Sequence, residues 1–91
     1  MKITDVKSGL YRIPLPTVLS DSTHGDISHF ELVTARVRDS DGREGVGYTY
    51  TTGTGGSGIH ALIADLMPVL IGSDPLRTEE LWERMWWRIH F

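Results

Sequence analysis

The stretch HFELVTARVRDSDGREGVGYTYTT, residues 29 to 52, carries two runs of extended character on either side of a short polar sequence. Alternating polarity, as in residues 29 to 38, is typical of a half-buried strand, because successive side chains of a strand point to opposite faces. The sequence Asp39-Ser40-Asp41-Gly42 supplies the polar and glycine residues that a tight turn requires. The stretch therefore predicts a β-hairpin. One face of its first strand is expected to carry Glu31, Val33, Ala35 and Val37.

A further strand and a long loop are predicted before this hairpin. Residues 2 to 15 alternate loosely, and Pro14 and Pro16 each remove a backbone donor, so we expect the strand to end there. The segment Thr17 to Ser28, TVLSDSTHGDIS, is polar and shows neither strand nor helix periodicity. We expect a loop of about a dozen residues, whose length favours a functional role over a plain hairpin tip. The three strands then form an antiparallel meander.

Two helices are predicted after the hairpin. The glycine-rich segment 53 to 58 leads into a run in which apolar residues recur at helical spacing, and a helix is predicted from about Ser57 to Ile71. Pro68 is expected to distort its last turn. Asp74 and Pro75 indicate the N-cap and first turn of a second helix. The expected apolar stripe of that helix consists of Leu81, Trp82, Met85, Trp86 and Ile89.

These elements predict an α+β fold, in which helices cover one face of a three-stranded antiparallel sheet. Trp87 falls outside the stripe of the second helix, so that helix is apolar over more surface than so small a sheet can cover. We therefore expect a second domain or subunit to cover the rest. Residues 86 to 91 do not become more polar toward the end of the chain and contain no helix-ending signal. Residues 1 to 91 are therefore expected to be one domain, truncated at its C-terminal end.

Composition and charge exclude several classes of function. Hydrophobic residues make up 40% of the chain and charged residues 23%, as in folded globular proteins, and the formal net charge is -3. No cationic field is present that would attract nucleic acid. The chain contains no cysteine, no signal-peptide pattern and no apolar run near the ~20 residues that span a bilayer. We expect a cytoplasmic protein that binds neither nucleic acid nor membranes.

The sequence contains no complete catalytic or metal-binding set. Gly53-x-Gly55-x-x-Gly58 matches the spacing of a dinucleotide fingerprint, but the strand before it belongs to an antiparallel hairpin and no second strand with an acidic end follows the helix. A flexible glycine hinge is the favoured interpretation. None of the four histidines has a partner ligand at helical spacing, and no serine lies in a nucleophile elbow. We predict neither catalytic residues nor metal ligands in this chain.

The order of these parts, together with three short motifs, resembles the N-terminal capping domain of the mandelate racemase and muconate lactonizing branch of the enolase superfamily. The resemblance covers essentially the whole chain. Its most specific motifs are DGREGVG at 41 to 47, IGSDP at 71 to 75 and LWERM at 81 to 85.

In such enzymes, the resemblance implies, a (β/α)7β barrel follows this region, binds Mg²⁺ through acidic residues and carries the lysine or histidine acid and base. The metal stabilises the enediolate that forms when a proton is taken from the carbon next to a carboxylate. All of these groups would lie outside this chain. The resemblance also implies that the partners are the barrel domain of the same protein and a carboxylate substrate, and that the full-length protein is a homo-oligomer.

The same resemblance implies that residues 17 to 28 and 50 to 58 are two capping loops, which exclude water from the barrel mouth and select the distal end of the substrate. Their polar residues suit a polyhydroxy acid, whereas a mandelate-like aromatic substrate would require a more apolar first loop. We therefore expect an acid-sugar dehydratase, with a racemase or a lactonizing enzyme as the alternative. The expected substrate-binding residues are Thr23, His24, Tyr50, Thr51 and Thr52.

A rival hypothesis from another class is a free-standing module that binds small molecules or proteins through its exposed tryptophan face. The length of the natural chain separates the two hypotheses. A capping domain joined to a barrel of about 250 residues requires a protein of roughly 350 to 400 residues.

Overall fold

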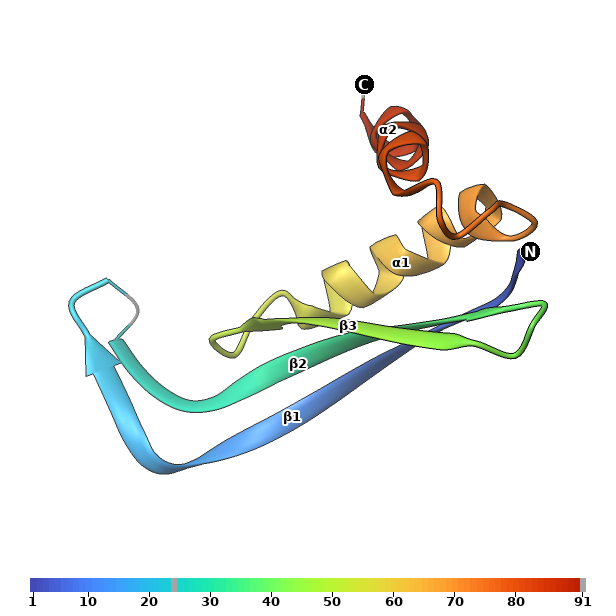
Figure 1. Ribbon diagram of the computed structural model, residues 1–91. Coiled ribbons are helices and arrows are strands. Elements are labelled where there is room, and N and C mark those ends of the chain that lie inside the picture. Colours follow the sequence, from blue (N-terminus) through green and yellow to red (C-terminus); the bar gives the residue numbers. More distant parts are fainter. Residues whose placement is uncertain (24, 91) are drawn as a thin grey trace.

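A computed structural model describes residues 1 to 23 and 25 to 90 of the chain. Three strands precede two helices, with bounds β1 Ile3–Asp21, β2 Gly25–Asp39, β3 Glu44–Thr51, α1 Gly56–Leu70 and α2 Thr78–Ile89. The strands form one antiparallel sheet in the order β1-β2-β3 (Figure 1). The predicted α+β meander with two helices is therefore confirmed.

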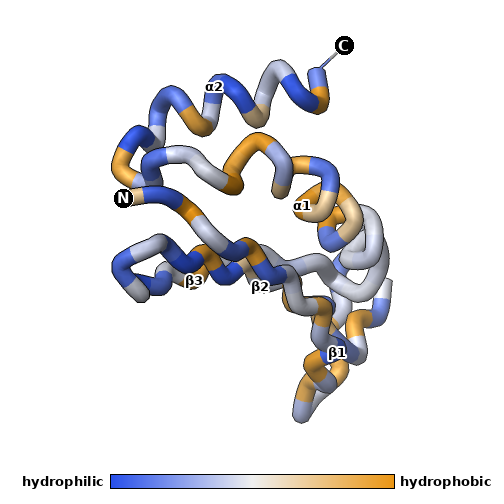
Figure 2. The backbone as a smooth tube through the Cα atoms, turned by 90° about the vertical axis from the view of Figure 1, so that its right-hand side faces the viewer, coloured by the Kyte–Doolittle hydropathy of each residue, from blue (hydrophilic) through white to orange (hydrophobic). Residues whose placement is uncertain are grey.

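The helices lie in two layers on the same side of the sheet. Helix α1 runs along the sheet and packs on β1 and β2, and α2 lies beyond α1 (Figures 1 and 2). The face of β2 that carries Glu31, Val33, Ala35 and Val37 includes the most buried residue of the strand, Val33, whose side chain is 1% exposed. The core lies at the end of the sheet near the N-terminus. It consists of the buried residues Ile3, Val6 and Leu81, surrounded by Val37, Ile63, Met67 and Leu70.

The prediction that the first strand ends at its prolines is wrong. Strand β1 continues through Pro14 and Pro16 to Asp21, and the pairing register with β2 shifts between Pro14 and Leu19. Because β1 is an edge strand, a missing backbone donor on its free side breaks no ladder hydrogen bond, and a register shift absorbs the irregularity. Most of the predicted loop at residues 17 to 28 is therefore a hairpin arm, which bends from the sheet toward the side of α1 (Figure 1).

The predicted start of the second helix is also too early. The side-chain Oδ1 of Asp74 accepts a hydrogen bond from the backbone N–H of Leu76 at 3.0 Å, and its carbonyl accepts one from Arg77 at 3.2 Å. These bonds close a turn ahead of α2, which begins at Thr78. The first helix agrees with its predicted range and retains Pro68 in its last turn. Helix α2 ends at Ile89.

Helix α2 buries much less of its apolar stripe than predicted. Leu81 is its buried residue, whereas Trp82 and Trp86 of the stripe are 63% and 43% exposed, and Trp87, outside the stripe, is 65% exposed. The Trp82 and Trp86 rings stack on each other with centroids 5.9 Å apart. The tryptophan side of α2 is thus an open apolar surface, because α2 rests mainly on α1 and reaches the sheet through Leu81. None of the described helices has the length and apolar character needed to cross a membrane.

The turn between β2 and β3 is held by a buried carboxylate. The Oδ1 atom of Asp39 accepts hydrogen bonds from the backbone N–H groups of Asp41 at 2.9 Å and Arg43 at 3.0 Å, and its Oδ2 accepts one from Arg43 Nε at 3.1 Å. Burial acts to raise the pKa of Asp39, but these hydrogen bonds and the Arg43 charge outweigh it and hold that pKa below its ordinary value of 3.8. The turn sequence therefore contributes stability as an ionised cluster.

We expect Asp39→Asn to lower the thermal midpoint near neutral pH, because it removes the charge from this cluster. The contribution of Asp39 is fully present above pH 3.8 and is lost as the pH falls through the lower folded pKa. The midpoints of the wild type and the variant should therefore converge on acidification. Thermal melts between pH 7 and pH 2 measure this, with Asp65→Asn on the exposed side of α1 as the control. A gap between the midpoints that stays constant over this range would contradict the assignment.

Candidate functional site

The glycine-rich loop, residues 52 to 55, joins the end of β3 to the start of α1. Gly53 and Gly55 adopt positive φ angles of 120° and 99°. Residues with a Cβ rarely adopt such angles, so glycine permits this tight connection between strand and helix. The structure therefore accounts for the glycines by backbone geometry.

Glu31 on β2 binds both ends of the glycine-rich loop. Its Oε1 atom accepts a hydrogen bond from the Thr51 hydroxyl at 2.8 Å and another from the backbone N–H of Gly56 at 3.0 Å. The Thr51 hydroxyl oxygen in turn accepts a bond from the backbone N–H of Gly53 at 3.2 Å. The bonds from Gly56 and from Thr51 lower the pKa of Glu31 below its ordinary value of 4.5. Glu31 is thus an ionised cap for α1 that comes from a neighbouring strand.

Gly56 is buried because Glu31 lies directly against it. A Cβ atom at this position would lie 2.9 Å from both Glu31 Cδ and Leu10 Cδ1. At Gly58, two residues further along α1, a Cβ atom would meet nothing within 4 Å. The close approach of Glu31 to the helix therefore requires glycine at position 56 and does not require it at position 58.

This geometry argues against the dinucleotide interpretation of the glycine motif. A nucleotide phosphate would need the free N–H groups at the start of α1, and the Gly56 N–H is bound to a carboxylate. The preceding strand β3 is also antiparallel to its neighbour β2. The motif is thus a turn that Glu31 fixes to the sheet.

The tip of the β1–β2 arm carries the other predicted binding residues. The backbone N–H of Thr23 donates to Asp21 Oδ1 at 2.8 Å, which forms a short polar turn, and Thr23 itself is exposed. His24 lies outside the residues that the structure describes. The arm tip therefore presents Thr23 in the solvent-facing position that a substrate-contacting loop requires.

The remaining predicted residues do not share one surface. Tyr50 pairs with Leu32 and its ring lies 5.2 Å from that of Phe30, on the face of the sheet away from the helices. Thr51 points to the opposite face, where its hydroxyl binds Glu31, and Thr52 is exposed on the glycine-rich loop. Sequence reasoning missed Glu31. The feature that could have revealed Glu31 is that it is the one carboxylate on a predicted strand face whose other members, Val33, Ala35 and Val37, are apolar.

The described histidines serve the fold. His29 lies under Gly53, and a Cβ atom at Gly53 would approach its ring to 3.4 Å. His60 on α1 shares a 2.7 Å hydrogen bond with the Ser8 hydroxyl of β1, so it faces the sheet. His90 stacks on Trp86 with centroids 4.5 Å apart. Among the described residues, no group of three or more His, Cys, Asp or Glu side chains is arranged to hold a metal ion.

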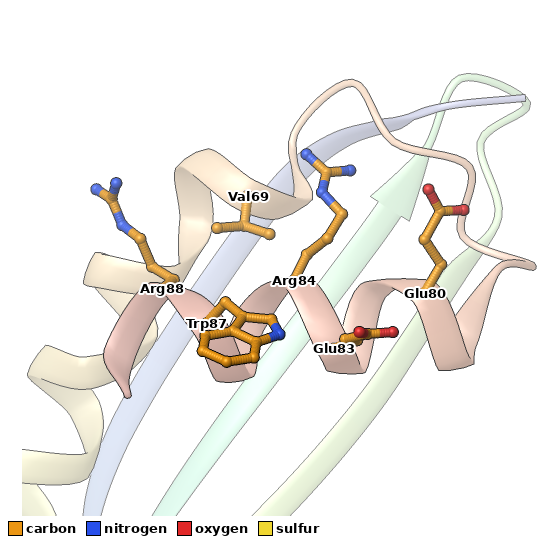
Figure 3. A pocket seen from close by; sticks show the side chains of 6 residues that line it. All are labelled: Val69, Glu80, Glu83, Arg84, Trp87 and Arg88. Carbon is orange, nitrogen blue, oxygen red and sulfur yellow. The ribbon is translucent and has the colours of Figure 1, made fainter. Parts of the chain in front are cut away.

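The surface pockets lie away from the glycine-rich loop and the arm tip. One, of about 410 Å³, lies between the end of α1 and α2, where Trp87 and the charged side chains of α2 extend along the helix without converging on a point (Figure 3). A larger, apolar groove of about 560 Å³ runs between α2 and the end of the sheet near Met1. Neither of these two gathers the polar groups that a sugar-like ligand requires. A third hollow of about 470 Å³, beside the turn that precedes α2, is lined by polar side chains that include Asp74, Arg77 and Arg84.

Comparison with known proteins relates the chain to a defined family of domains. The model of the mandelate racemase / muconate lactonizing enzyme N-terminal domain matches residues 4–90. The chain is 50% identical over 90 residues to a 3,6-anhydro-alpha-L-galactonate cycloisomerase from Streptomyces coelicolor, a match that covers 98% of this chain and 25% of that protein. It is 31% identical over 91 residues to an L-talarate/galactarate dehydratase from Salmonella typhimurium, covering 94% of this chain and 23% of that protein.

A solved structure agrees with these relationships. A racemase from Streptomyces coelicolor A3(2) with bound magnesium superposes with a TM-score of 0.96 at 50% identity, over 98% of this chain and 25% of that one. The chain thus spans about a quarter of the length of the relatives that it matches. These relatives are full-length enzymes in which the matched region is one domain.

Proposed function

Because the chain belongs to the mandelate racemase / muconate lactonizing enzyme N-terminal domain family, we propose that it is the substrate-capping domain of a magnesium-dependent enzyme that acts on a sugar acid. The observation that carries this proposal is the 50% identity to a sugar-acid cycloisomerase over almost the whole chain. The described residues contain no metal-binding cluster, so the proposal assigns the Mg²⁺ ligands and the catalytic acid and base to a C-terminal (β/α)7β barrel of the same protein.

The role of this chain is to enclose the substrate. Water exclusion strengthens the electrostatic interactions of the reacting groups, and contacts at the distal end of the substrate set specificity. In this proposal two capping loops enclose the substrate. One is the β1–β2 arm tip, with Thr23 and His24. The other is the segment of residues 50 to 58, which contains Tyr50, Thr51 and Thr52. The Thr51 hydroxyl donates a hydrogen bond to Glu31, and Thr51 adjoins the glycine-rich loop in which the proposal places substrate contacts.

The polar composition of the arm tip supports an acid sugar over an aromatic acid. With such a substrate, removal of the proton next to the carboxylate and loss of the neighbouring hydroxyl as water gives dehydration. Cycloisomerisation is a second candidate, because the cycloisomerase is 50% identical to this chain and the dehydratase 31%. The two reactions share the proton abstraction and differ in mass balance, since only dehydration releases a water molecule. Racemisation, which also begins with that step, remains the third alternative.

A screen of the full-length protein tests the proposal. We expect Mg²⁺-dependent turnover of one of galactarate, L-talarate or 3,6-anhydro-α-L-galactonate, and loss of turnover when EDTA removes the metal. Mass spectrometry identifies dehydration, because that reaction lowers the product mass by one water, whereas cycloisomerisation and racemisation leave it unchanged. Metal-independent turnover, or a natural protein without a barrel domain, would contradict the proposal and favour a free-standing binding module. Size-exclusion chromatography of the same sample tests the proposed homo-oligomer.

A further inference from the structure

We propose that Glu31 is a positioning residue, which fixes the glycine-rich loop in the conformation that receives the substrate. This inference rests on the proposed function, since it assigns that loop a role in substrate binding. It goes further by naming a residue outside both capping loops that controls one of them. Glu31 itself contacts Thr51 and Gly56, so it acts on the substrate through the loop.

The loop has few other restraints between its ends. Two of its glycines, Gly53 and Gly55, have the backbone freedom to adopt many conformations. Three hydrogen bonds select one of them: the Thr51 and Gly56 bonds to Glu31 Oε1, and the Gly53 bond to Thr51. Two of them end on one carboxylate oxygen, and the third ends on the Thr51 hydroxyl that donates to this oxygen. Moving that oxygen would release the end of β3 and the start of α1 together.

The surroundings of Glu31 favour its charged form and hold it in place. Arg12 is its register partner on β1, and Arg12 and His29 both act to lower the pKa of Glu31. The start of α1 adds the positive end of the helix dipole. On the other side, the ring of His29 lies beneath Gly53. The carboxylate is therefore held by hydrogen bonds from β3 and α1, with a favourable charge from Arg12 of β1, and it passes this rigidity to the loop.

Loop order has a defined kinetic consequence. A loop that samples many conformations must be ordered when the substrate binds, and this entropy cost weakens binding. The catalytic groups proposed for the barrel are unaffected once the substrate is bound. Loss of the anchor should therefore raise KM with little change in kcat, which is the pattern for loss of uniform binding. A general loss of folding would instead lower the fraction of active enzyme and hence the apparent kcat.

The test compares Glu31→Ala with Glu31→Gln in the full-length protein. Both hydrogen bonds end on a single oxygen, Oε1, so a glutamine carbonyl can accept them, whereas alanine has no acceptor. Glu44→Ala is the matched control, because Glu44 forms exposed ion pairs with Arg36 and Arg38 at the far end of the sheet. The readouts are amide hydrogen exchange at Gly53 and Gly56, and KM and kcat for the substrate that the screen identifies.

We expect Glu31→Ala to speed exchange at Gly53 and Gly56 and to raise KM by about tenfold or more, as misplaced positioning groups do. Glu31→Gln should stay within about threefold of the wild-type KM, and Glu44→Ala should match the wild type. Unchanged exchange or an unchanged KM in Glu31→Ala, with normal wild-type turnover, would overturn this inference alone. Absence of wild-type turnover on every sugar acid would overturn the proposed function, and with it the kinetic role of Glu31. In that case, amide hydrogen exchange at Gly53 and Gly56 would still decide whether Glu31 anchors the loop.

Discussion

Replacing Leu81 with alanine is expected to lower the free energy of unfolding of this 91-residue chain by about 2–5 kcal/mol. Leu81 is 6% exposed and is the residue through which α2 reaches the buried cluster of Ile3 and Val6. Truncation removes its transfer free energy and leaves a cavity that the sheet cannot readily close. Because small domains are only marginally stable, we expect α2 to detach well below the wild-type denaturation midpoint.

Urea denaturation followed by tryptophan fluorescence measures this effect, since the three tryptophans all lie on α2. Leu76→Ala is the matched control, because that side chain is 70% exposed, and surface changes usually stay within about 0.5 kcal/mol. Equal effects of the two substitutions would show that the Leu81 cluster is not the core of the domain.

The second prediction concerns two glycines in the same helix, which should respond in opposite directions to alanine. Gly56→Ala places a methyl group 2.9 Å from Glu31 Cδ and Leu10 Cδ1, so one or both must move. Overpacking of this kind costs about 1–3 kcal/mol, and it also displaces the carboxylate that caps α1. We therefore expect Gly56→Ala to destabilise the domain, although alanine is the better helix former.

Gly58→Ala meets no atom within 4 Å and should stabilise the domain by up to about 1 kcal/mol, through the higher helix propensity of alanine. Paired urea titrations of the two variants and the wild type measure the difference. A Gly56→Ala variant that is as stable as Gly58→Ala would mean that Glu31 does not lie against α1.

Local patterns were sufficient to predict the centre of the fold. The alternation in residues 29 to 38 and the Asp39–Gly42 turn predicted β2, the residues of each of its faces and the hairpin to β3. Helical spacing after the glycine-rich segment predicted α1 to within a residue at each end. These elements are set by side chains that lie close together in the chain, and such patterns can be read from sequence.

The errors arose where tertiary context decides the local structure. Pro14 and Pro16 would end a central strand, but β1 lies at an edge, and edge position cannot be read from the residues themselves. Asp74 forms a turn where an N-cap was predicted, since the same side-chain oxygen serves either structure. The stripe of α2 was assigned to the sheet, whereas α2 packs on α1 and leaves its tryptophans exposed.

The candidate site was predictable only in part. The two segments that carry it were identified from a long polar stretch and a glycine-rich stretch, and the second is a loop in the structure. The sequence did not reveal that Tyr50 and Thr51 point to opposite faces. Nor did it reveal that Glu31, twenty positions before Thr51, accepts a hydrogen bond from the Thr51 hydroxyl. Pairing between distant residues depends on strand register, which no local pattern encodes.

Hydrogen exchange of the full-length protein, with Mg²⁺ and with or without its saturating sugar-acid substrate, tests the capping role most directly. If this domain closes over the substrate, binding should slow amide exchange in residues 21 to 25 and 50 to 58, and leave the exposed α2 surface around Trp87 unchanged. If both segments exchange at the same rate with and without substrate, while the enzyme turns over, this domain does not cap the active site.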